Sequence, residues 1–136
     1  MLEAKRFLKQ YQTLTVKIKE LEEEIEHKQS VIDSISINYS GMPKSNKISM
    51  RTEDLAIYIS DKKLELEQLK IAAEIKRDGI VDIIHRIDDA LLNEILYKKY
   101  IELKEWKNIG EELYISERWA QIKHKDALKK VSFLIS

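Results

Sequence analysis

The sequence predicts an all-α protein, in which a long antiparallel helical hairpin (a coiled coil) is followed by a small helix-turn-helix bundle. Apolar residues recur at alternating steps of three and four over most of the first 87 residues, which is the heptad pattern of a coiled coil. One proline and three glycines in 136 residues leave little to interrupt long helices. We expect a hairpin over residues 1–87 and a helix-turn-helix domain over residues 88–136.

The first helix of the hairpin is expected to run from near the N-terminus to about Ser36, because no proline or glycine precedes Gly41. A single lysine, Lys28, interrupts its seam. The seam residues are Phe7, Tyr11, Leu14, Ile18, Leu21, Ile25, Lys28, Ile32 and Ile35.

Residues 37–49 hold the only proline, one glycine and most of the small polar residues, so they are predicted to form the connecting loop. Two seams of similar length joined by a loop of this size favour an antiparallel hairpin. The role of the run Ser40-Gly41-Met42-Pro43 stays open.

The second helix of the hairpin is expected to begin at Thr52, whose hydroxyl can cap it, with Glu53 and Asp54 in its first turn. A seam of two helices buries each of them only in part, so we predict homodimerisation through the hairpin. The second seam consists of Leu55, Ile59, Lys62, Leu66, Leu69, Ala73, Lys76, Ile80, Ile83 and Ile87.

The next helix can be capped by Asp88 and Asp89. It is expected to be the first helix of the C-terminal bundle. Its dense apolar face consists of Ala90, Leu91, Leu92, Ile95 and Tyr100.

A short helix, a three-residue turn and a longer basic helix are predicted over residues 103–130. Trp106, Ile109 and Leu113 fall at i, i+3 and i+7, on one face of the short helix. Gly110 costs that helix roughly 1 kcal/mol relative to alanine, which suggests a close approach by a second helix. Ser116 supplies the oxygen that an N-cap needs. The longer helix is expected to turn inward Ala120, His124, Ala127, Leu128 and Val131.

Four segments carry a family resemblance: Tyr100-Ile-Glu, Trp106-Lys-Asn-Ile-Gly-Glu-Glu-Leu, Ser116-Glu-Arg and Asp126-Ala-Leu-Lys-Lys. They resemble the fourth conserved region of bacterial sigma factors, and still more a group of phage-encoded regulators built on that module, the ArpU-like late transcription regulators. The resemblance covers the last third of the chain and implies control of phage late genes together with host RNA polymerase. Tyr114 departs from it, because such turns usually have glycine there. Either the turn is built differently, or packing of the ring offsets a cost of about 1 to 2 kcal/mol.

Residues near the start of a recognition helix reach base edges, and later ones reach phosphates. The predicted base contacts are Glu117, Arg118, Gln121 and Ile122. The predicted phosphate contacts are Ser116, Lys123, Lys125, Lys129 and Lys130. Trp119 either stacks on the nucleic-acid backbone or packs against Trp106, and packing is favoured. His124 is expected to be a half-buried histidine with a hydrogen-bond partner.

The charges balance overall at 24 cations and 24 acids but are unevenly distributed. Residues 116–130 hold five cations and two acids, whereas residues 20–26 hold five glutamates and no cation. The acidic face is a candidate contact for polymerase or another protein.

Several function classes lack support in the sequence. There is no cysteine, no glycine-rich phosphate loop and no nucleophile elbow. No apolar run approaches the ~20 residues that a membrane span needs, and the N-terminus does not resemble a signal peptide. The i, i+3 pairs Glu24/His27 and Asp82/His85 flank the seams rather than occupy them, so we expect no metal site, no cofactor and no catalysis.

We therefore expect a non-enzymatic, sequence-specific regulator that binds double-stranded DNA as a homo-oligomer in the cytoplasm of a host bacterium, at the nucleoid. Two alternatives stay open. A DNA-packaging recognition subunit also joins a helix-turn-helix to an oligomerising coiled coil, and a helical scaffold would bind protein only.

Overall fold

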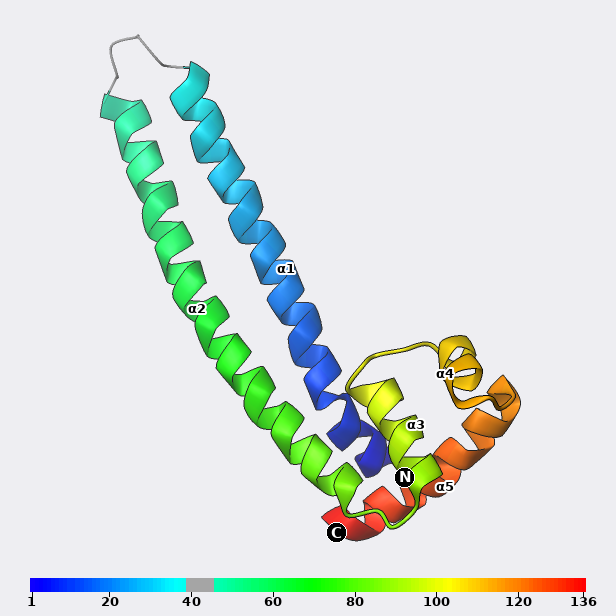
Figure 1. Ribbon diagram of the computed structural model, residues 1–136. Helices are drawn as coiled ribbons and strands as arrows, with labels where there is room; N and C mark the ends of the chain where they lie inside the picture. The colour runs from blue at the N-terminus through cyan, green and yellow to red at the C-terminus, as the bar shows by residue number, and fades with distance from the viewer. Residues whose placement is uncertain (39–45) are drawn as a thin grey trace. The chain divides into compact units, whose positions relative to one another are not determined.

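The computed structural model describes residues 1–38 and 46–136, which form five α-helices and no strand (Figure 1). The helices are α1 (Leu2–Asn38), α2 (Asn46–His85), α3 (Ala90–Tyr100), α4 (Trp106–Leu113) and α5 (Glu117–Ile135). The predicted all-α class, with two long helices followed by three short ones, is confirmed. None of the helices in the described part of the chain is long and apolar enough to cross a membrane.

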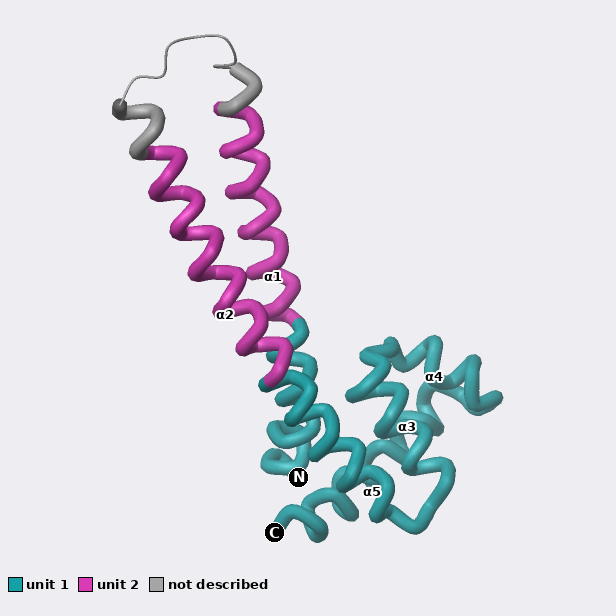
Figure 2. Tube along the Cα trace, turned by 60° about the vertical axis from the view of Figure 1, so that its left-hand side comes forward, with its two compact units in different colours: residues 1–15, 72–136 teal, residues 16–71 magenta. Residues whose placement is uncertain are grey.

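The chain forms two compact units (Figure 2). One contains residues 16–71, the other residues 1–15 and 72–136. These units cut the chain at different positions from the predicted boundary at residue 87, because the first residues of α1 and the last turns of α2 pack with the C-terminal helices. Each unit is described by itself below.

The unit of residues 16–71 is a pair of antiparallel helical segments from α1 and α2. The Tyr58 hydroxyl donates a hydrogen bond to the Glu24 carboxylate, and Lys70 Nζ lies 3.7 Å from Glu22 Oε1. The contact residue on α2 therefore lies later in the chain (Lys70 rather than Tyr58) when the contact residue on α1 lies earlier (Glu22 rather than Glu24), as an antiparallel pair requires. Leu21 and Ile59 are buried, and the remaining predicted seam residues of this unit whose side chains are described are half-buried.

The two lysines in these seams are accommodated by one aromatic ring. Lys28 Nζ lies 5.6 Å and Lys62 Nζ 5.4 Å from the centroid of the Tyr58 ring. A cation within about 6 Å of a ring centroid is attracted by the negative face of the ring. The lysines therefore interrupt the apolar seam without leaving their charges unsatisfied.

The predicted start of α2 is wrong. The helix begins at Asn46, six residues before Thr52, so Thr52 lies inside α2 and is not its N-cap. The predicted loop is also too long, because α1 continues to Asn38. No proline or glycine follows Pro43 before Thr52, so nothing in the sequence stops the helix there. The run Ser40-Gly41-Met42-Pro43 lies outside the described residues.

The second seam shifts by one residue at its C-terminal end. Lys76 is exposed, whereas Arg77 is half-buried and its Nη2 donates to the Tyr97 hydroxyl at 3.1 Å. Ile84 is fully buried where Ile83 was predicted, and Ile83 is half-buried. An insertion of this kind, which moves the stripe around the helix, is a stutter in the heptad repeat.

The core of the unit of residues 1–15 and 72–136 gathers apolar residues from the start of α1, the end of α2 and the C-terminal helices. Ala4 and Leu8 of α1 are fully buried in it, although neither belongs to the predicted seam. The buried members are Ala4, Leu8, Ile80, Ile84, Ile87, Leu92, Leu96, Tyr100, Ile101, Ala127, Leu128 and Val131.

The predicted cap of α3 is confirmed at Asp89, whose carboxylate accepts a hydrogen bond from the Leu92 amide at 3.2 Å. The inward face of α3 follows the prediction at Leu92, Ile95 and Tyr100, which are buried. Ala90 is the exception. It is exposed at the first position of the helix, and Leu91 is half-buried.

Candidate nucleic-acid interface

Helices α4 and α5 form a helix-turn-helix with a turn at residues 114–116, as predicted. Ile109 of α4 and Ala120 of α5 are fully buried and share a small core with Ile95 of α3. Trp106 and Leu113 pack against this core. The three helices therefore hold each other through side chains that the 3.6-residue period places on their inner faces.

The turn contains a residue in the left-handed conformation. Tyr114 has φ 57° and ψ 39°, and the residue is 95 % exposed. Both predicted alternatives are therefore wrong, because the turn has the left-handed residue that such turns use and no packing of the ring offsets its cost. The Ile115 amide donates to the Gly110 carbonyl at 3.0 Å, which closes the end of α4.

Gly110 marks a close approach, as predicted. A Cβ at this position would lie 2.9 Å from the carbonyl oxygen of Ile115 and 3.3 Å from the amide nitrogen of Glu117. Both are backbone atoms that cannot rotate away. The turn and the first residue of α5 thus sit directly on α4, and the tightness of the corner depends on the missing side chain.

Ser116 caps α5, as predicted. Its Oγ accepts a hydrogen bond from the Trp119 amide at 3.0 Å, and the backbone of Ser116 is extended. Serine at this position satisfies one of the orphan amides of the first turn. The hydroxyl proton remains available to a phosphate, so Ser116 keeps its predicted role as a candidate phosphate contact.

The inner face of α5 consists of the five predicted residues, all of them buried. His124 is the polar one, only 8 % exposed, and therefore more deeply buried than the predicted half-buried state. Its Nε2 lies 2.6 Å from the Tyr100 hydroxyl, and the Trp106 ring meets it edge-on at 4.8 Å between centroids.

Burial controls the protonation of this pair. It lowers the pKa of His124 to about 4, with help from the positive charges of Lys5, Lys99 and Lys9. It also raises the pKa of Tyr100 to about 12. Desolvation disfavours the charged form of each group. Both side chains are therefore neutral at physiological pH.

The outer face of α5 carries the predicted contact residues. Arg118, Ile122, Lys125 and Lys129 are exposed and fall at i, i+4, i+7 and i+11, which forms one stripe opposite the buried face. Phe133 continues the stripe and is 81 % exposed. Sequence reasoning missed Phe133, although its spacing from Lys129 is the signal that would have included it.

The other predicted contact residues lie beside this stripe. Gln121 is exposed on the flank of α5 next to the first turns of α1. The opposite flank holds Lys123, which is half-buried, and Lys130, which is exposed. Glu117 is exposed at the first position of α5.

Trp119 does not pack against Trp106, and the predicted preference is wrong. Trp119 is 44 % exposed and lies outside the core that Trp106 joins. Lys123 Nζ lies 4.9 Å above the Trp119 ring. The ring occupies the flank of α5 instead, because the inner face is already filled by Ala120 and His124.

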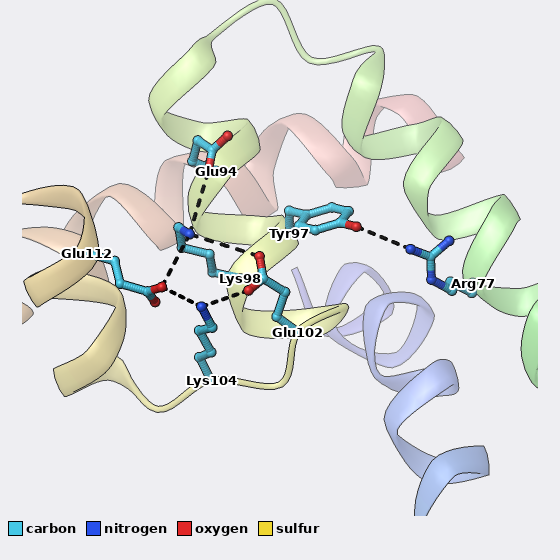
Figure 3. A network of polar contacts seen from close by, with 7 residues as sticks. All are labelled: Arg77, Glu94, Tyr97, Lys98, Glu102, Lys104 and Glu112. Carbon is cyan, nitrogen blue, oxygen red and sulfur yellow. Dashed lines mark hydrogen bonds and ion pairs between the residues drawn. The ribbon is translucent and has the colours of Figure 1, made fainter.

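Charged side chains tie α4 to α3 (Figure 3). Lys98 Nζ lies within 3.9 Å of Glu94, Glu102 and Glu112. Lys104 pairs with Glu102 at 2.7 Å and with Glu112. Hydrogen bonds to Lys104 lower the pKa of Glu112, and hydrogen bonds to Glu102 and Glu112 raise the pKa of Lys104. These charges serve the packing of the bundle.

His27 and His85 are exposed. Within the part of the chain that the structure describes, no group of three or more histidine, aspartate or glutamate side chains is placed to hold a metal ion.

No protein-family model, no curated protein and no solved structure matches this chain. The likeness of residues 100–130 to sigma-factor region 4 therefore stays a prediction from the sequence.

Proposed function

We propose that this protein is a sequence-specific DNA-binding transcription regulator, an activator of phage late genes that acts with the host RNA polymerase. One observation carries the proposal. A helix capped by Ser116, behind a tight corner at Gly110, presents Arg118, Ile122, Lys125 and Lys129 outward along one stripe. A stripe of this composition suits the major groove of DNA, which admits an α-helix.

The stripe, together with Gln121 on its flank, offers two kinds of contact. Arg118 and Gln121 lie near the start of α5, where arginine can bind guanine and glutamine can bind adenine through two hydrogen bonds each. Ile122 can meet the methyl group of thymine. Lys125 and Lys129 lie further along, where they reach phosphates and set affinity rather than sequence choice.

Selection of bound fragments from a random duplex pool tests the proposal. The enriched duplex should bind more weakly to Arg118→Ala by about 1 to 3 kcal/mol, or roughly 5- to 150-fold. Arg51→Ala is the matched control, because Arg51 is exposed on α2 in the other unit. Equal affinities of both variants for the duplex would contradict the assignment of Arg118.

We also propose that a second copy of the chain binds along the outer face of α2. Ile57, Leu64 and Ile71 are 61 %, 62 % and 61 % exposed and recur every seven residues. Exposed aliphatic residues at this spacing are typical of a coiled-coil seam that lacks its partner. A dimer would present two helix-turn-helix domains, as two half-sites in DNA require.

Sedimentation of the full chain tests the dimer. Leu64→Gln should shift the protein toward monomer, whereas Val16→Gln, which changes an exposed residue of α1, should leave the mass unchanged. A monomeric wild-type protein at micromolar concentration would contradict this seam.

The proposed contact with polymerase involves fewer acids than the sequence suggests. Glu22 and Glu24 interact with Lys70 and Tyr58 inside the hairpin. Glu20, Glu23 and Glu26 are exposed and have no ion pair within the described residues. Changing these three to lysine should abolish activation of transcription while DNA binding is retained; loss of both would point to a folding defect instead.

The exposed seam of α2 also suits the two alternative functions. A DNA-packaging recognition subunit would form a ring-sized oligomer rather than a dimer in the sedimentation experiment. A scaffold that binds only protein would retain no duplex DNA even at low salt.

A further inference from the structure

A groove runs between the first turns of α1 and the side of α5, within the unit of residues 1–15 and 72–136. It has a volume of about 370 Å³. Lys5 of α1 and Lys125 of α5 both line it, with Gln121 beside Lys125 and with Trp106 and His124 at its wall. The groove therefore shares Lys125 with the outer stripe of α5 and Gln121 with the flank of that stripe, so the two surfaces are continuous.

Cations gather at this groove. The charges of Lys5, Lys9 and Lys99 act on His124, which lines the groove, and help to keep it neutral. Lys99 Nζ lies 4.9 Å above the ring of Trp106, another lining residue. Lys5 and Lys9 are four residues apart on α1, an arrangement of like charges that disfavours a helix. The repulsion between Lys5 and Lys9 and the closeness of lysine charges to the buried His124 are both unfavourable in the protein without a bound anion.

These cations lack acidic partners within the part of the chain that the structure describes. Among the residues that the structure describes, Lys5, Lys9, Lys99 and Lys125 form no ion pair with an acid. Lys98, the chain neighbour of Lys99, is within 3.9 Å of three glutamates (Figure 3). Three acids of the bundle are therefore engaged by Lys98, and the cations at the groove form no ion pair among the described residues.

We propose that this groove is a second DNA contact. Its two lining lysines, Lys5 and Lys125, hold phosphates of the DNA backbone that flanks α5, together with the nearby Lys9 and Lys99. The inference rests on the proposed function and extends it to α1. The choice of DNA follows from position. Because Gln121 and Lys125 belong both to the groove and to the base-reading helix, an anion in the groove lies beside whatever α5 binds, and the backbone of the same duplex supplies that anion.

The salt dependence of binding tests this contact. The affinity of the full chain for the selected duplex is measured between about 50 and 200 mM salt for the wild type and for Lys5→Gln/Lys9→Gln. Each phosphate contact contributes about 0.9 to the slope of log affinity against log salt. The double variant should lower that slope by about 2. It should weaken binding to unrelated duplexes as well, because phosphates carry no sequence.

Two further variants separate charge from structure. Lys17→Gln/Lys19→Gln removes two exposed lysines of α1 in the other unit and should keep the wild-type slope. Lys5→Arg/Lys9→Arg retains the charge and should restore the slope. A wild-type slope for Lys5→Gln/Lys9→Gln would overturn the groove contact and leave the proposed function standing. No binding of any duplex by the wild type would overturn both.

Discussion

Acid should destabilise this protein through one buried histidine. His124 has a pKa of about 4 in the folded protein, chiefly because it is buried against Tyr100 and Trp106. In the unfolded chain a histidine has a pKa of about 6.5. Between these two values the unfolded state binds more protons than the folded state, so the free energy of unfolding rises with pH. The contribution is complete above pH 6.5 and is lost as the pH falls toward 4.

The magnitude follows from the two pKa values. A separation from 6.5 to about 4, at about 1.36 kcal/mol per pH unit, gives an upper limit of about 3 kcal/mol. At pH 4.5 the same two-state expression gives a loss of about 2 to 3 kcal/mol relative to pH 7. Because a domain is stabilised by only about 5 to 15 kcal/mol in total, this single group makes a measurable difference.

Urea unfolding between pH 4.5 and 7.5 measures the effect when the wild type is compared with His124→Gln. Glutamine does not titrate, and its amide oxygen can accept a hydrogen bond from Tyr100. The carboxylates are the same in both proteins, so their contributions to the pH dependence cancel when the two profiles are compared. The free energy of unfolding of the wild type should fall by about 2 to 3 kcal/mol more than that of the variant. His85→Gln, at an exposed position of α2, should behave as the wild type does. Parallel pH profiles for the wild type and His124→Gln would refute the reasoning.

Three substitutions near the turn have further expected outcomes, each measured by thermal or urea unfolding. Gly110→Ala should destabilise the protein by about 1 to 3 kcal/mol because the new Cβ meets backbone atoms. Gly79→Ala, whose Cβ would have nothing within 4 Å, should stabilise the protein by about 0.5 to 1 kcal/mol. Equal effects of the two substitutions would contradict the close approach at Gly110. Tyr114→Gly should stabilise by up to about 1 kcal/mol, since the left-handed cost exceeds the entropic cost of glycine, and Tyr114→Ala should not. Trp106→Ala should lower the free energy of unfolding by about 1 to 3 kcal/mol, and Trp119→Ala should lower it much less. A larger effect of Trp119→Ala would contradict the assignment of Trp106, rather than Trp119, to the core.

The elements predicted best from the sequence are those whose causes are local. Ser116 and Asp89 cap helices because an oxygen at that position reaches an amide within the next turn, a relation that depends on only a few residues. The heptad seams follow from spacing alone, since residues three and four apart share a helix face. The close approach at Gly110 could also be predicted, because glycine destabilises a helix interior and its presence there suggests a contact too close for a side chain.

The features that could not be predicted depend on contacts between distant parts of the chain. Nothing local shows that Ala4 and Leu8 are buried with the C-terminal helices, because their spacing also continues an ordinary helix face. The position of Trp119 also depends on distant contacts. A large aromatic residue favours a prediction of packing, and only the structure shows that other side chains already fill the inner face of α5. The prediction that Thr52 caps α2 was wrong for another reason. A threonine can cap a helix only where the helix begins, and α2 already begins at Asn46.

The ion pairs explain how a chain with 24 cations and 24 acids leaves a group of lysines without acidic partners among the described residues. Glu94, Glu102 and Glu112 surround Lys98 and Lys104, and these pairs hold α3 and α4 together. The acids of the bundle that are engaged in this way cannot also balance the lysines at the groove. Sequence composition averages over both sides of α3, whereas an approaching polyanion meets only one. The local sign of the surface is therefore set by which lysines have partners.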